Sequence, residues 1–126
     1  MYIREVALNK FFGAVFVLWP AGLLAQPYSE SMADCAAIYQ NAAQGVESEA
    51  SAEQLMFAAR RWAAAAVVQT AAEGQPMSER GMWDKVDRKT GAWGEKGAMF
   101  ALTTEFRDWT SYCRSFAKDR GIEIRP

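Results

Sequence analysis

Two cysteines, Cys35 and Cys113, are the residues of this sequence best placed to do chemistry. An even number of cysteines in a small exported chain favours a structural disulfide, and only one intramolecular pairing exists here. Their wide separation excludes the Cys-x-x-Cys spacing of a catalytic redox pair. The sequence therefore predicts a Cys35–Cys113 disulfide, the alternative being two reduced cysteines that pack as small buried side chains.

Two pairs of carboxylates are spaced one helical turn apart, as an acid and base or a cation site would require. They are Asp84 with Asp87, and Glu105 with Asp108. Basic side chains lie between the members of each pair, which is typical of a solvated helix face. Catalysis would need a cleft that desolvates one carboxyl group.

The chain contains no histidine. Serine-histidine and cysteine-histidine catalysis, histidine-ligated zinc and c-type haem attachment are therefore excluded. Met77 and Met82 are soft ligands of the kind that copper(I) prefers, but residues five apart on a helix share a face poorly. We expect them to fill gaps in the core, and we predict no catalytic residue, metal site or cofactor.

Tryptophans are numerous, and an exposed tryptophan can anchor a partner or a ligand. Trp93 lies in a glycine-rich stretch with Lys96 close by, so the local sequence gives little reason for its burial. Trp62 and Trp109 fall on apolar stripes and are expected in the core. The predicted contact residues for a partner or ligand are Trp93, Trp83 and Lys96.

The first 25 residues have the pattern of an export signal. Arg4 and Lys10 precede an apolar run over residues 11–24, and Ala25 supplies the small residue before a cleavage point. We expect residues 1–25 to be a signal peptide and residues 26–126 to form a single helical domain, periplasmic or secreted. Leu23 departs from the small-x-small preference, which leaves an uncleaved anchor as the alternative.

The predicted mature chain has nearly balanced charge. Removal of Arg4, Lys10 and Glu5 leaves 12 basic and 14 acidic side chains, a net charge of −2. No surplus of positive charge attracts nucleic acid or anionic lipid. We therefore expect no nucleic-acid partner, and membrane contact only through the signal segment before cleavage.

Alanine-rich stretches and the near absence of β-branched runs predict helices throughout. Capping signals and glycine stops place them at residues 31–44, 51–73, 78–90 (or from Pro76) and about 99–120, with a loop over 91–97. Ser31 and Ser51 are the predicted caps of the first two, and the second is expected to be central. The fourth carries an apolar stripe formed by Met99, Leu102, Phe106, Trp109, Cys113 and Phe116.

These features predict an all-α fold, a small up-down-up-down four-helix bundle whose first and last helices the disulfide joins. The function they favour is that of a small exported binding protein without enzymatic activity, whose partner is an envelope protein or a small molecule. Three alternatives remain: a periplasmic stress chaperone, a carrier with an apolar cavity lined by Trp62, Trp83 and Trp109, and an enzyme that uses carboxylates without histidine.

Overall fold

The structure is a computed structural model that describes residues 26–126, so the predicted export segment lies outside the described residues. Over this range the chain is all-helical. Its elements are α2 (Tyr28–Gly45), α3 (Glu49–Ala72), α4 (Glu79–Gly94), the short 3₁₀ helix η3 (Ala98–Leu102) and α5 (Thr104–Arg120). None of the helices in this part of the chain is both long and apolar enough to cross a membrane.

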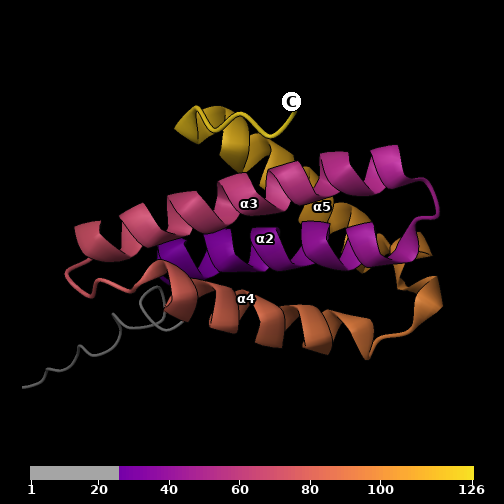
Figure 1. The fold of residues 1–126 in the computed structure, drawn as a ribbon, viewed down its shortest axis with the longest axis horizontal. Coiled ribbons are helices and arrows are strands. Elements are labelled where there is room, and N and C mark those ends of the chain that lie inside the picture. The colour runs from indigo at the N-terminus through magenta and orange to yellow at the C-terminus, as the bar shows by residue number, and fades with distance from the viewer. Residues whose placement is uncertain (1–25) are drawn as a thin grey trace, which may run out of the picture.

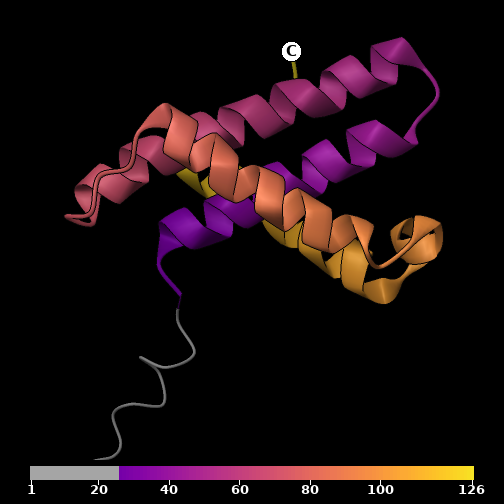
Figure 2. The same cartoon turned by 60° about the horizontal axis from the view of Figure 1, so that its bottom comes forward.

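Helices α2 and α3 form an antiparallel pair, and α4 and α5 each pack across α2. Figure 1 shows α2 between α3 and α4, with α5 behind α2. In the tilted view of Figure 2, α2 and α3 run side by side, whereas α4 and α5 cross this pair at a steep angle. Four α-helices are thus confirmed, but the predicted up-down-up-down alignment is not, because α4 and α5 cross the α2–α3 pair instead of running along it.

Helix α2 is the centre of the core, and the prediction that the second helix would be central is wrong. It packs against α3, α4 and α5. Six of its side chains are at most 2 % exposed: Met32, Ala33, Cys35, Ala36, Ala37 and Ile38. The small size of the alanines lets the neighbouring helices approach α2 closely from several sides.

Side-chain caps begin α3 and α4, whereas α2 begins without one. Helix α2 starts at Tyr28 after Pro27, whose fixed φ suits a helix start, so the predicted cap at Ser31 is wrong. Ser31 lies inside the helix, buried. Ser48 caps α3 in place of Ser51, with its hydroxyl accepting from the Ser51 amide at 3.2 Å. Ser78 caps α4, as predicted, and accepts from the Gly81 amide.

Helix α4 continues to Gly94, so the predicted loop over residues 91–97 is wrong in its first half. Glycine inside a helix costs about 1 kcal/mol relative to alanine, which gives at most about 2 kcal/mol for Gly91 and Gly94. Burial of a tryptophan contributes about 4–6 kcal/mol from its area. Trp93 is only 8 % exposed, so its burial outweighs the glycine cost and keeps the helix intact.

The predicted fourth helix is divided in two. Thr103 has an extended backbone (φ −86°, ψ 157°), which ends η3, and its hydroxyl caps α5 by accepting from the Phe106 amide at 3.2 Å. Met99 and Leu102 therefore leave the apolar stripe, and both are about two thirds exposed. The predicted end at Gly121 is confirmed, with a left-handed φ of 67°.

The disulfide between Cys35 and Cys113 is confirmed, with a Cα–Cα distance of 5.7 Å. Both residues are fully buried, and the bond joins α2 to α5. Phe116, one turn further along α5, packs against Trp62 of α3 with ring centroids 5.3 Å apart. The bond thus fastens the last helix to the centre of the core.

An ion cluster holds α4 against the first turns of α2. Lys85 Nζ lies 2.6 Å from Glu30, and Lys89 Nζ lies 2.9 Å from both Glu30 and Asp34. Partial burial works to raise the pKa of Glu30, but hydrogen bonds and positive charge from the two lysines outweigh it, so this pKa lies below its ordinary value of 4.5. The cluster therefore links folding to the ionisation of Glu30.

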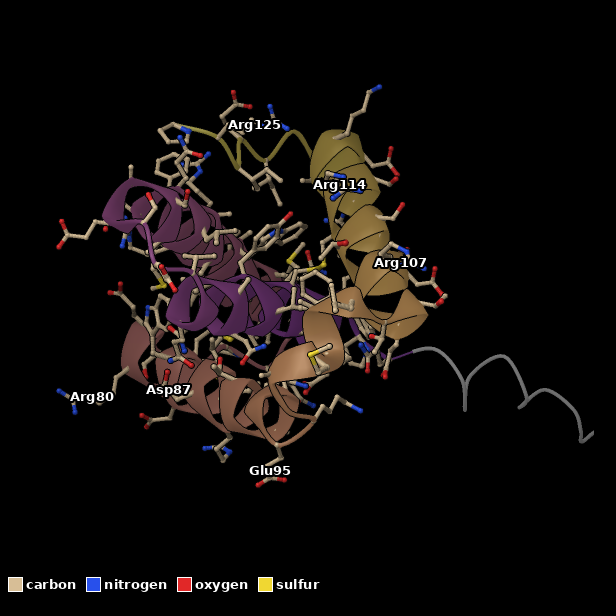
Figure 3. The ribbon with its side chains drawn as sticks, turned by 90° about the vertical axis from the view of Figure 1, so that its right-hand side faces the viewer. Arg80, Asp87, Glu95, Arg107, Arg114 and Arg125 are labelled. Atoms are coloured by element: carbon tan, nitrogen blue, oxygen red, sulfur yellow. A yellow bond between two sulfur atoms is a disulfide. The ribbon has the colours of Figure 1, made fainter. Side chains whose placement is uncertain are left out.

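We expect Glu30→Gln to reduce the acid sensitivity of the fold. Because the folded-state pKa of Glu30 is depressed, its contribution to stability is present above pH 4.5 and is lost as pH falls through the folded-state pKa. Urea unfolding at pH 7 and at pH 3.5 measures this loss, which should be smaller in the variant. Glu95→Gln, an exposed carboxylate at the end of α4 (Figure 3), is the control and should retain the full loss. Equal losses in both variants would contradict this role for Glu30.

Candidate functional site

Six aromatic rings form a continuous row from η3 along α5 to the core. Successive ring centroids in this aromatic row lie 5.1–5.8 Å apart, with edge, stacked and tilted contacts. In order the rings are Phe106, Phe100, Trp93, Trp109, Tyr112 and Phe116. The row joins the end of α4 to α5, and it fixes the position of η3 through Phe100.

Trp93 and Lys96 lie together, but Trp93 is not the exposed residue that the sequence led us to expect. Its ring stacks on Phe100 at 5.1 Å and meets the edge of Trp109 at 5.7 Å. Lys96 Nζ lies 5.6 Å from the centroids of Trp93 and Phe100, within the range of cation–π attraction. Trp93 is therefore buried beneath the molecular surface, whereas Lys96 is exposed on it.

On η3 and α5, large apolar side chains are exposed to solvent. Met99 is 67 % exposed, Leu102 is 68 % exposed and Tyr112 is 43 % exposed. Phe106 and Trp109 on α5 are half-buried and pack against the core. We call the surface formed by Met99, Leu102, Phe106, Trp109 and Tyr112 the apolar face.

Charged groups of both signs border the apolar face. Lys96 pairs with Glu105 at 3.5 Å. Arg107 points from α5 toward solvent (Figure 3) and donates to the Leu102 carbonyl. Asp108, together with Trp109, Tyr112 and Ser31, lines a shallow hollow of about 260 Å³. The face thus has an apolar centre with a mixed-charge border.

Trp83 is not brought to this face. It is half-buried and lines a separate hollow of about 330 Å³ between α3 and α4, with Arg60 and Val67. Ten residues of helix separate it from Trp93, which is about 15 Å along the axis. Trp62 is fully buried against Phe116, whereas Trp83 and Trp109 line two different surface hollows.

The carboxylate pairs are exposed on helix surfaces. Asp84 and Asp87 face solvent on α4, and Asp87 accepts a hydrogen bond from Gln40 at 3.0 Å. Glu105 is exposed in its pair with Lys96. The structure brings none of these carboxylates into the buried cleft that acid–base catalysis would need.

The sequence analysis did not predict that Met99 and Leu102 of the apolar face are exposed. Met99 and Leu102 fit the three- and four-residue spacing of the stripe on α5, so they were assigned to the core. The signal that separates them is Thr103, a good N-cap residue with Glu105 in the following turn. A helix that begins after Thr103 leaves both side chains on η3.

Comparison of the chain with family models, with curated proteins and with solved structures found no match.

Proposed function

We propose that this chain is an exported binding protein without enzymatic activity, and that it binds another protein through the apolar face. The observation that carries the proposal is the concentration of Met99, Leu102 and Tyr112 within 14 residues of sequence. The remaining large exposed apolar residues of the described chain, Tyr28, Val46 and Val68, lie on other helices or their ends.

The composition of the face favours a protein partner. Protein interfaces concentrate aromatic residues, methionine and arginine at their centres and place polar groups at the rim. Three residues of the face, Phe106, Trp109 and Tyr112, are held in place by their ring contacts in the aromatic row, so little ordering entropy is lost on binding. The partner expected is a protein with an apolar patch bordered by charges of both signs.

The Cys35–Cys113 disulfide supports the assignment to the periplasm or the exterior. Disulfides persist in such compartments and are rare in the cytosol. The export pattern of residues 1–25 points the same way. The lack of histidine in the sequence and the exposed positions of the carboxylate pairs favour binding over catalysis.

We expect Leu102→Lys to weaken partner binding by about tenfold or more, because it places a charge at the apolar centre of the interface. Val68→Lys is the matched control, since Val68 is 71 % exposed on α3. Affinity capture from envelope extract with the mature chain would isolate the partner, and titration of the purified pair would give the Kd of each variant.

Loss of binding in Leu102→Lys with retention in Val68→Lys supports the proposal. Equal binding by the two variants, or capture of no protein, contradicts it. Size-exclusion chromatography with light scattering on the purified chain tests whether it self-associates. A dimer that Leu102→Lys dissociates would replace the proposed partner with a second copy of the chain.

A further inference from the structure

A groove of about 740 Å³ lies between the middle of α2, the first half of α3, α5 and residues 122–126. Figure 3 shows the chain after α5 running back toward α3, with Arg125 on this segment and Arg114 on α5. This volume falls within the range of small-molecule sites in proteins. Its lining includes Tyr39, Gln54, Leu55, Arg114, Ile124 and Arg125.

The segment that carries Arg125 is held in place. Arg61 Nε donates to the Glu123 carbonyl at 3.0 Å, and the Ile122 amide donates to the Ala117 carbonyl at 2.9 Å. Ile122 and Ile124 are half-buried and pack against the core. Arg125 is therefore presented to the groove by an anchored segment.

The groove has positive charge that the described chain does not neutralise with a side chain. No aspartate or glutamate of residues 26–126 lines it. Over the same residues neither Arg114 nor Arg125 forms an ion pair. A guanidinium group without a carboxylate partner is free to hold an anion through paired N–H donors.

Tyr39 lines the same groove as Arg114 and Arg125, and its hydroxyl adds a neutral donor. Burial raises the pKa of Tyr39, while the positive charges of Arg114 and Arg125 act to lower it. The amide of Gln54 is a further hydrogen-bonding group. Leu55 and Ile124 supply an apolar wall in the same groove.

We infer that this groove binds a small amphiphilic anion, with a carboxylate or phosphate group held by Arg114 and Arg125 and an apolar body against Leu55 and Ile124. This site is distinct from the apolar face and does not depend on the proposed protein partner. Carboxylate and phosphate share acceptor oxygens, to which guanidinium N–H groups can donate hydrogen bonds.

Isothermal titration calorimetry with four probes tests the site on the mature chain. Octanoate and octyl phosphate distinguish the two head groups, octanol lacks the charge and acetate lacks the apolar body. We expect octanoate, octyl phosphate or both to bind, and octanol and acetate to bind at least about tenfold more weakly. Arg114→Gln and Arg125→Gln should each weaken anion binding by about tenfold.

Arg80→Gln is the matched control, because Arg80 points to solvent from α4 (Figure 3) and the substitution removes the same net charge. It should leave the affinity unchanged. Arg114 and Arg125 are exposed, so circular dichroism should show all three variants folded. Absence of binding by both anions, equal affinity for octanol and octanoate, or equal loss in Arg80→Gln and Arg114→Gln would overturn the inference.

Discussion

Replacing both cysteines, in a Cys35→Ala/Cys113→Ala variant, is expected to lower the free energy of unfolding by up to about 4.5 kcal/mol at 25 °C. The bond joins residues 78 apart, and the loop-closure entropy for that separation sets this upper value. A small domain has a total stability of about 5–15 kcal/mol, so the loss is a large part of it. Urea unfolding followed by circular dichroism measures the change.

Helix α5 should respond most to loss of the bond. Only Cys113, Phe116 and Ala117 of this helix are buried, so few other contacts hold it. Amide hydrogen exchange in α5 should therefore accelerate more than in α2, which the rest of the core encloses. The wild-type chain with a reducing agent is the control and should resemble the variant. Unchanged stability after verified reduction would contradict the prediction.

The sequence was sufficient for features with a local physical cause. Cys35 and Cys113 were paired by counting, Ser78 was identified as a cap, and Gly121 was identified as a helix end that needs a left-handed residue. Each depends on the chemistry of one or two residues in their immediate surroundings. Such signals do not require knowledge of the neighbouring helices.

Features that depend on distant contacts could not be predicted. Burial of Trp93 requires Phe100 and Trp109, which lie on two other elements, and without them the glycines around it indicate a loop. The angles at which α4 and α5 cross α2 depend on how its alanines contact these helices, which helical periodicity does not specify. The groove near Arg114 likewise exists only because residues 122–126 fold back over α3.

Trp62→Ala is expected to destabilise the fold by about 3–5 kcal/mol, as deletion of a large buried ring does. Trp62 is fully buried, and the alanines around it, among them Ala59, Ala63 and Ala66, are too small to fill the space left behind. Trp83→Ala is the control, because Trp83 is half-buried at the surface and should cost about 1–2 kcal/mol. Urea unfolding of both variants measures the difference.

Trp62→Phe distinguishes the effect of ring volume on stability from the effect of the buried indole N–H. The Nε1 group of Trp62 is buried and has no hydrogen-bond acceptor within the described chain, and an unpaired buried donor costs about 1–3 kcal/mol. Phenylalanine removes this donor and retains most of the contact with Phe116. The variant should therefore lose much less stability than Trp62→Ala. Equal losses would mean that the indole N–H is itself stabilising, and that volume alone does not account for the role of Trp62.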